Sequence, residues 1–148
     1  MANTTFSGPV RSENGFDFIT KNATTGAITT NASYGKGVTG GVQSLSGAGA
    51  VDTTNLVTEL TTTGADALTL ANGSVGQIKI ITMIVDGGDG TLTPTTFANG
   101  TTITFNDAND TVALLYANTI GWVVISNSGA TVASVSYTHL TLPTILRV

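Results

Sequence analysis

The chain has 148 residues, only 9% of them charged, and its formal net charge is −4. Soluble domains average roughly 25% charged residues, so a monomer of this composition would expose a large neutral surface and tend to associate. The five basic residues are scattered, cysteine is absent and no apolar run is long enough for a bilayer, which argues against nucleic acid, thiol chemistry and a membrane as partners.

Residues 1–44 are rich in Gly, Asn, Ser and Thr, with isolated large apolar side chains. Turn signals containing Gly separate two segments with strand character, residues 11–20 and 26–33. This part has too little apolar surface for a core of its own, so it is either a flexible leader or an arm that orders against a partner. Because Phe16 and Phe18 are bulky for a leader, we expect an extended N-terminal attachment arm.

Six of the fifteen residues from 35 to 49 are Gly, which predicts a flexible hinge at the end of the arm. A loose G-x-G pattern occurs twice in this segment. A dinucleotide-binding loop needs a strand before it and a helix after it, and neither is visible here. We therefore expect a domain boundary near residue 45 and no nucleotide site.

The apolar run Gln77–Val85 is the centre of the predicted fold. Gly76 precedes it, and the Asp- and Gly-rich turn at residues 86–90 follows it. Several of its side chains are β-branched, which favours a strand over a helix. A short apolar run between turn residues predicts a strand that is buried on both faces, against which the shorter strands pack.

Further strands are expected at regular spacing between Gly and Asn turns, at residues 51–60, 67–70, 90–93, 101–105, 111–116 and 122–125. Short strands spaced in this way predict an all-β fold, a compact antiparallel β-sandwich or barrel that occupies residues 45–134. Tyr116 and Trp122 flank one predicted hairpin, and we expect them to make a large apolar contact across it.

Residues 135–144 resemble the conceptual translation of a sequencing adapter of the kind that contaminates metagenomic reads. The resemblance implies that residues 135–148 are a non-native tail and that the sole histidine, His139, has no evolved role. The alternative is a genuine last strand that contains Tyr137 and Leu140. Under the first interpretation, deleting residues 137–148 leaves the melting temperature unchanged.

Candidate chemistry is sparse. Nucleophilic triads and zinc sites need His or Cys, and the nine carboxylates show no spacing that selects a catalytic pair. We therefore expect no enzyme and no cofactor. Asp86 and Asp89 could give oxygen ligands to a Ca²⁺ ion, although Asp with Gly is also what a tight turn selects. Trp122 and Tyr116 could form a platform for glycan stacking, although such a pair more often lies in a core.

Several segments resemble small virion structural proteins of marine tailed bacteriophages. They are the opening residues 1–16 and the segments 68–73, 76–79, 85–89, 101–105 and 122–127. The resemblance implies a head-decoration or fibre protein, often trimeric, with an N-terminal attachment segment and a distal β-rich module. It carries over no catalytic or binding residues. It also implies that the protein is made in the cytoplasm of a bacterial host and resides in the virion.

Two hypotheses follow. The first is a non-enzymatic virion component whose partners are copies of itself and other virion proteins. Its oligomer interface is expected near residues 78–85 and 112–116, with the contact residues Ile78, Ile80, Ile84, Leu114 and Tyr116. The second is a carbohydrate- or receptor-binding tip of a phage fibre that contacts a host surface glycan through Trp122, Tyr116 and the loop at residues 86–90. Exposure of Trp122 favours the second hypothesis, and burial removes it.

Overall fold

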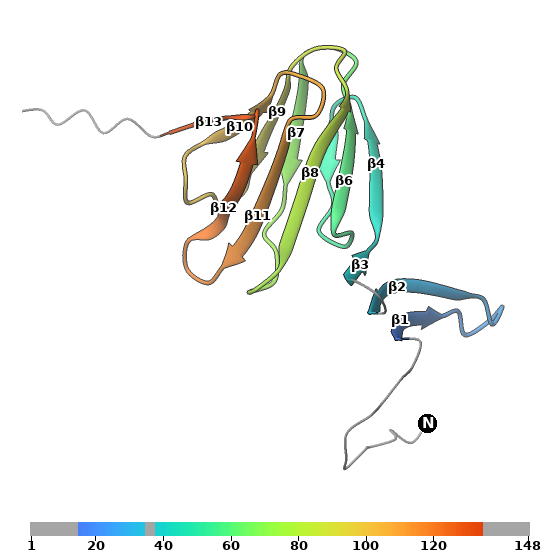
Figure 1. Ribbon diagram of the computed structural model, residues 1–148. Helices are drawn as coiled ribbons and strands as arrows, with labels where there is room; N and C mark the ends of the chain where they lie inside the picture. Colours follow the sequence, from blue (N-terminus) through green and yellow to red (C-terminus); the bar gives the residue numbers. More distant parts are fainter. Residues whose placement is uncertain (1–14, 35–37, 135–148) are drawn as a thin grey trace, which may run out of the picture.

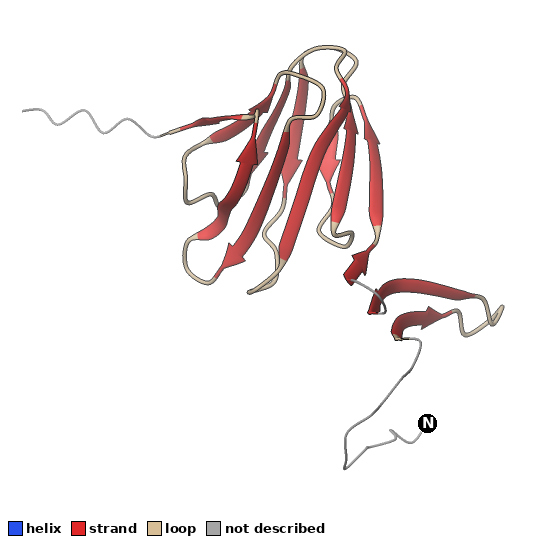
Figure 2. Cartoon of the chain, viewed as in Figure 1, coloured by secondary structure: helices blue, strands red, loops and turns tan. Residues whose placement is uncertain are grey.

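The computed structural model describes residues 15–34 and 38–134. Every regular element in these two ranges is a β-strand (Figure 2), which confirms the all-β prediction. The same residues accordingly include no helix with the length and apolar character needed to cross a membrane. Residues 1–14 and 35–37 of the expected attachment arm and hinge, and the adapter-like tail from residue 135, lie outside the described residues, so the predictions about them remain predictions.

Two five-stranded sheets face each other and form a sandwich (Figure 1). The first, the β8 sheet, contains in spatial order β12 (Gly121–Ser128), β11 (Thr111–Ala117), β8 (Ile78–Val85), β6 (Val57–Thr61) and β4 (Val42–Ser46). The second, the β9 sheet, contains β13 (Thr131–Ala133), β10 (Thr102–Phe105), β9 (Gly90–Pro94), β7 (Asp66–Leu70) and β5 (Gly49–Val51). The apolar run around Ile81 is therefore the central strand of its sheet, as the sequence indicates.

A smaller antiparallel sheet precedes the sandwich. It consists of β1 (Phe16–Lys21), β2 (Ile28–Tyr34) and β3 (Val38–Gly40). The turn between β1 and β2 is closed by Asn22, whose Oδ1 accepts hydrogen bonds from the main-chain N–H groups of Thr24 and Thr25, and Gly26 adopts a φ of 73°. Such side-chain caps and positive-φ glycines are what a tight turn requires. The small sheet leads through β3 to the end of the sandwich where β4 begins (Figure 1).

From β4 to β9 the chain alternates between the two sheets at every strand. β4, β6 and β8 lie in one sheet and β5, β7 and β9 in the other, so the chain makes three coils of a flattened spiral. The first coil is β4 and β5, the second is β6 and β7, and the third is β8 and β9. Each coil places its strands beside those of the preceding coil, and all four resulting pairs are parallel. β10 to β13 then close the sandwich as antiparallel neighbours on one side.

The expectation of a wholly antiparallel sandwich is therefore wrong for the three coils. An antiparallel neighbour arises when a tight hairpin returns the chain within one sheet. Here the turn at Gly47 and Ala48 instead carries the chain from β4 to β5 in the opposite sheet. Strand length and apolar content do not encode this difference, because both kinds of connection use short turns rich in Gly and Asp.

The space between the sheets is filled by side chains that alternate along each strand. Those with at most 2% exposure include Leu60, Leu68, Leu70, Ile81, Met83, Leu92, Ile103, Phe105, Val112, Leu114 and Trp122. Burying such a side chain stabilises the fold by about 1.5–3 kcal/mol relative to leaving it exposed. Both sheets contribute to this one cluster, so the three coils and the antiparallel strands share a single core.

β8 is buried on one face only, and the prediction of burial on both faces is wrong. Its inward side chains alternate with Ile78, Ile80 and Ile84 on the outer face, and Ile78 and Ile84 are about half exposed, at 45% and 49%. The sequence cannot distinguish the two faces because both are apolar. Among residues 15–34 and 38–134, no further strand or sheet covers this outer face.

The described part of the Gly-rich segment, residues 38–49, forms strands β3, β4 and β5, and the hinge function stays a prediction. β4 is held by parallel pairing with β6 from Val42 to Ser46. Gly40 packs against Leu56, and Gly41 packs against the Asn55 side chain, so closely that an added Cβ would clash at either position. Glycine is therefore selected here for close approach as well as for flexibility. The expected boundary at residue 45 falls inside β4, and the domain division itself stays a prediction.

Candidate functional site

The loop at residues 52–56, between β5 and β6, contains a dense hydrogen-bond network at one end of the sandwich. Asp52 Oδ1 accepts hydrogen bonds from the main-chain N–H groups of Thr54 (3.1 Å) and Asn55 (2.9 Å). The second oxygen of Asp52, Oδ2, accepts a hydrogen bond of 2.6 Å from Asn55 Nδ2. A short acidic side chain that bonds the following backbone in this way defines a turn, so the loop has one well-determined conformation.

Gln43, on the inner face of β4, ties this loop to the first coil. Its Oε1 accepts hydrogen bonds from Asp52 N at 2.9 Å and from Thr58 Oγ1 at 2.8 Å. Its Nε2 donates to the main-chain oxygen of Ala50 at 2.9 Å. Polar side chains between two sheets are tolerated when their donors and acceptors are paired, and the network around Gln43 meets that condition.

Lys79 extends from β8 into the same network and is fully buried. Its Nζ donates to the main-chain oxygen of Asn55 at 2.9 Å and lies 3.5 Å from Asp52 Oδ1. Burial lowers the pKa of the Lys79 amine below its ordinary value of 10.5, and the Asp52 carboxylate offsets only part of that effect. A buried ammonium with one distant carboxylate partner is costly, so the amine of Lys79 loses its proton more readily than a surface lysine does.

The pKa of the Asp52 carboxyl group is shifted as well. Burial by itself raises its pKa, but hydrogen bonds from the main chain and side chain of Asn55, together with the charge of Lys79, outweigh burial. The pKa of Asp52 therefore lies below its ordinary value of 3.8, and the group is a carboxylate at neutral pH. The site thus joins a proton acceptor, an amide and an amine within one hydrogen-bonded cluster.

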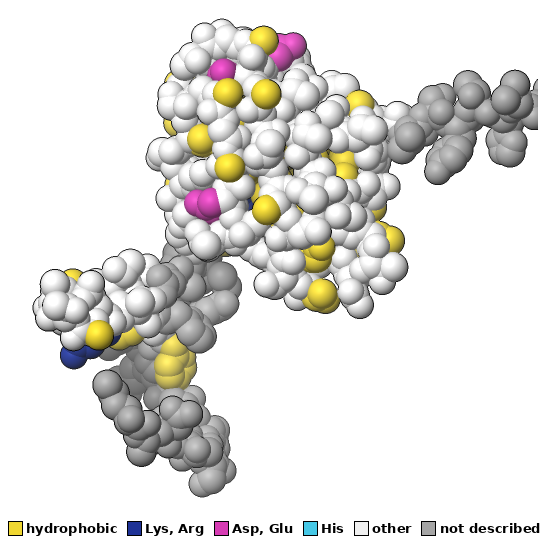
Figure 3. Space-filling model, turned by 180° about the vertical axis from the view of Figure 1, so that it is seen from behind, with side chains coloured by type: hydrophobic (Ala, Val, Ile, Leu, Met, Phe, Trp, Pro, Cys, Tyr) yellow, Lys and Arg dark blue, Asp and Glu magenta, His cyan; other side chains and the backbone are white. Residues whose placement is uncertain are grey.

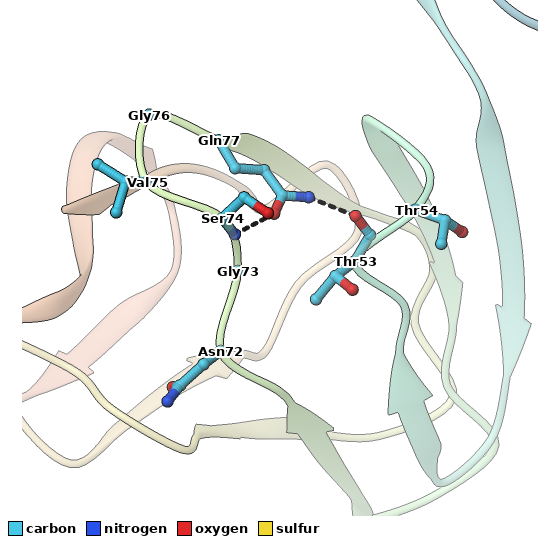
Figure 4. Close-up of a pocket in the computed structure, with 8 residues that line it drawn as sticks. All are labelled: Thr53, Thr54, Asn72, Gly73, Ser74, Val75, Gly76 and Gln77. Carbon is cyan, nitrogen blue, oxygen red and sulfur yellow. Dashed lines mark hydrogen bonds between the residues drawn. The ribbon is translucent and has the colours of Figure 1, made fainter. Parts of the chain in front are cut away.

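An open pocket lies beside this cluster, between the loop after β5 and the loop after β7 (Figure 4). It has a volume of about 580 Å³ and is lined by Thr53, Thr54, Asn72, Gly73, Ser74, Val75, Gly76 and Gln77. Gln77 links the two loops, because its Nε2 donates to the Thr53 main-chain oxygen and its Oε1 accepts from Ser74 N. The eight lining side chains include no ionisable group, so this pocket offers hydrogen bonds and no proton-transfer chemistry.

Trp122 lies under the loop that lines this pocket and is fully buried, so the proposed glycan platform is wrong. Its indole Nε1 donates to the Ala71 main-chain oxygen at 2.9 Å, and Gly73 packs directly against its ring. Tyr116 is half-buried and meets Trp122 edge to face, with ring centroids 5.2 Å apart. The predicted contact across the hairpin is therefore confirmed, and it belongs to the core. A ring without exposed surface cannot stack on a sugar.

Asp86 and Asp89 lie in the turn between β8 and β9, at the end of the sandwich opposite Lys79. Asp86 Oδ1 accepts a hydrogen bond from Gly88 N at 2.9 Å, and the Asp89 main-chain oxygen accepts one from Asp66 N. Within residues 15–34 and 38–134, no three Asp, Glu or His side chains gather in a way that could hold a metal ion. The turn role of Asp86 is thus visible, and the calcium site stays a prediction that no ligand cluster supports.

The expected interface residues separate into two groups. Ile78, Ile80 and Ile84 lie on the outer face of β8. Leu114 is fully buried in the core, and Tyr116 packs against the core, so the assignment of Leu114 to an oligomer surface is wrong. The register of β11 explains the error: Leu114 is opposite Lys79, on the inner face, and Leu115 is opposite Ile78, on the outer face.

Sequence reasoning missed Lys79, Asp52, Asn55 and Gln43. One signal was present: strict alternation along β8 places Lys79 on the same face as Ile81 and Met83. If that face is the inner one, the lysine must be buried and must find a partner. The partner could not be found in the same way, because Lys79 and Asp52 are 27 positions apart and meet only through the parallel coils.

No protein-family model matches the chain, and a search of curated proteins finds no match to it either.

Proposed function

We propose that the chain is a non-enzymatic structural subunit of a bacteriophage particle, of the head-decoration or fibre type, that works as a homo-oligomer. The observation that carries this proposal is the apolar outer face of the β8 sheet, which no strand or sheet within residues 15–34 and 38–134 covers. The resemblance of the sequence to small virion proteins supplies the phage setting and the expectation of a trimer. Residues 1–44 serve in this proposal as the segment that attaches to the particle or to neighbouring chains.

The outer face of the β8 sheet is mostly apolar in the half near the start of β8, around Ile78 and Ile80. Strand register and alternation place the following side chains on it: Val42, Ser44, Ser46, Val57, Glu59, Thr61, Ile78, Ile80, Thr82, Ile84, Thr111, Ala113, Leu115, Val123, Ser126 and Ser128. Glu59 is the one charged residue among them. Register aligns Val42, Val57, Ile80 and Ala113 in one row across four strands.

Apolar side chains on this face are exposed in the single subunit, which supports a role as an interface that another subunit covers. Val42, Ile78 and Ile84 on this face are each between 45% and 52% exposed. Scattered apolar side chains on a surface need no explanation, but a contiguous group on one sheet face marks an interaction site. Homo-oligomer interfaces are more apolar than the remaining surface, so sister subunits are the partners that this face suits.

The outer face of the β9 sheet differs in character. Its outward side chains are small and mostly threonine: Ala50, Ala67, Thr69, Thr91, Thr93, Thr102, Thr104, Thr131 and Ala133. Figure 3, seen from this side, shows few charged side chains and hydrophobic side chains that are scattered over the surface. The contrast between the two faces sets the orientation of each subunit in the proposed oligomer: the β8 sheet faces the other subunits and the β9 sheet faces outward.

Introducing charged side chains on the apolar outer face of the β8 sheet tests the proposal. Ile78→Lys and Ile84→Lys together place two charges on the outer face of β8 without entering the core, and Thr93→Lys places one on the opposite face as a control. We expect the double variant to lose subunit association in light scattering while it keeps the β-sheet circular dichroism of the parent. Thr93→Lys should associate like the parent. Equal association of all three proteins would exclude the β8 face as the interface.

A further inference from the structure

Independently of the proposed function, we propose that Lys79 and Asn55 join in an intramolecular isopeptide bond, formed by the protein itself, with Asp52 transferring the proton. The three residues bring an amine, a carboxamide and a carboxylate together at the end of the sandwich. An amide can be exchanged in this way only where a nucleophile, an electrophile and a proton carrier are held in place. The structure supplies each of them.

Asp52 is the bridge between the two reacting side chains. Its Oδ2 is 2.6 Å from Asn55 Nδ2, and its Oδ1 is 3.5 Å from Lys79 Nζ. One carboxylate thus contacts both the group that must leave and the group that must attack. A proton carrier has to lie within hydrogen-bond reach of the proton that it moves, and the contact to Nδ2 already has that length.

The Asn55 carboxamide is fixed in the orientation that this contact requires. Nδ2 is held by Asp52, and Oδ1 lies so close to Gly41 that any side chain at position 41 would collide with it. The Asn55 main chain is fixed as well, because its N–H donates to Asp52 Oδ1 and its oxygen accepts from Lys79 Nζ. The amine therefore already contacts the residue that it would attack, and the proposed reaction requires it to move from the main-chain oxygen of Asn55 to the side-chain Cγ.

The amine is also in a reactive state more often than a surface lysine is. Only a neutral amine is a nucleophile, and burial lowers the pKa of Lys79. Desolvation of a lysine among apolar neighbours is an established way of preparing it for nucleophilic attack. Fully buried apolar residues flank Lys79 on this face: Leu114 is its partner across the pairing with β11, and Ile81 is the next inward residue of β8.

The reaction balances without any further reactant. Asp52 takes a proton from the Lys79 ammonium, and the resulting lone pair on Nζ attacks Cγ of Asn55. In the tetrahedral intermediate Nζ carries two protons, and Asp52 passes the proton that it took to Nδ2, which leaves. The departing ammonia takes the second proton from Nζ and so leaves as ammonium. The N–C bond between Lys79 and Asn55 forms, the C–N bond of the carboxamide breaks, and the chain becomes lighter by one ammonia. Asp52 ends as the carboxylate that it was at the start. Its contact with the reacting groups makes it the catalytic residue.

Cleavage at Glu59 gives the most direct test, because this glutamate lies between the two linked positions. The full-length chain is purified, denatured and digested with a protease that cuts after glutamate. Unlinked chains separate into fragments that end at residue 59 and begin at residue 60, whereas linked chains keep these fragments together on a denaturing gel. Trypsin gives a second readout, because an acylated Lys79 is not cleaved and residues 37–147 stay in one peptide.

Intact mass decides the chemistry. We expect the parent chain to weigh less than its sequence mass by one ammonia. Asn-Gly pairs such as Asn72-Gly73 can also lose ammonia by cyclisation, so the loss must coincide with retained fragments after digestion. Lys79→Arg and Asn55→Ala keep the Asn-Gly pairs and should give separate fragments. Asp52→Asn keeps a side-chain oxygen for the turn but removes the carboxylate, and linkage should slow by about 10²–10⁴-fold.

Each remaining outcome contradicts the proposal. A folded parent chain that has its full sequence mass and separates after Glu59 shows that Lys79 is only an ion-paired lysine. Loss of one water instead of one ammonia shows that Asp52 is the electrophile, and the role given to Asn55 fails. Linkage of Asp52→Asn at the parental rate removes Asp52 from the chemistry. The first of these is measured on the parent itself, so it does not depend on the folding of any variant.

Discussion

Lys79 Nζ lies 3.5 Å from Asp52 Oδ1, and this contact joins the third coil of the sandwich to the loop that leaves the first. Lys79 belongs to β8, and Asp52 follows β5. Between them β6 and β7 complete the second coil, so the pair spans a whole turn of the spiral. Gln77, just before β8, reaches the same loop through its hydrogen bond to the Thr53 main-chain oxygen. Lys79 and Gln77 therefore both tie the third coil to the loop after β5.

The titration of Lys79 should be visible in stability. In Asn55→Ala the amine stays free, and its folded-state pKa lies below the ordinary 10.5. Between these two values the unfolded chain binds more protons than the folded chain, so the free energy of unfolding rises as pH increases. We expect this rise in denaturant titrations from neutral pH up to pH 10.5 and a loss of the slope above it. Lys79→Met in the same background is the control, and an identical slope in both variants would contradict the assignment.

Substitution by alanine should affect stability very differently at two glycines, Gly121 and Gly64. Gly121 has a φ of 80°, and an added Cβ would strike the main-chain oxygen of Thr96. Gly121→Ala should therefore reduce the free energy of unfolding by at least about 1–3 kcal/mol. Gly64 has open space where a Cβ would lie, and Gly64→Ala should change stability by no more than about 1 kcal/mol. Thermal unfolding of both variants checks the pair, and equal losses would be inconsistent with the turn geometry.

Adjacent leucines on β11 should behave differently. Leu114 is fully buried, so Leu114→Ala leaves a cavity in the core and should cost about 2–5 kcal/mol of unfolding free energy. Leu115 is half-buried on the outer face, and Leu115→Ala should cost clearly less in the isolated subunit. Denaturant titration at low protein concentration separates the two, because subunit contacts then contribute little. A larger loss for Leu115 would mean that the register of β11 is shifted by one residue.

Trp122 should act as a core residue. Trp122→Phe removes the hydrogen bond from Nε1 to the Ala71 oxygen and leaves space in the core where the larger ring lay, which should lower the free energy of unfolding by about 1–3 kcal/mol. Tyr116→Phe keeps the ring that meets Trp122 and should change stability by about 0.5 kcal/mol or less. Emission of the parent should be typical of a buried indole and unaffected by added glycans. A response of the emission to a glycan would reopen the platform hypothesis.

Local chemistry explains why most strands could be predicted. The run around Ile81 is apolar and β-branched, and turns with Gly, Asn or Asp bound it and its successors, so their positions follow from the sequence. The Tyr116–Trp122 contact also follows, because the two residues flank a short hairpin. These features depend on neighbours in sequence, and the fold keeps them.

The rest depends on contacts between distant segments. β4 contains Gln43, two serines and few large apolar residues, and it becomes a strand only through its parallel partner β6. The burial of Lys79 depends on which face of β8 is turned inward, and isoleucines on the other face conceal that choice. The site around Asp52 needs the loop after β5 to lie beside β8, which only the alternation of strands between two sheets brings about.

The mass of the protein in solution tests the central claim most directly. The claim is that this chain is a β-sandwich subunit whose apolar β8 face is covered by copies of itself. Multi-angle light scattering of the full-length chain at several concentrations should give a stable multiple of the 15.0 kDa chain mass, with three copies as the expected number. A soluble protein that keeps the mass of one chain at every concentration would contradict the account.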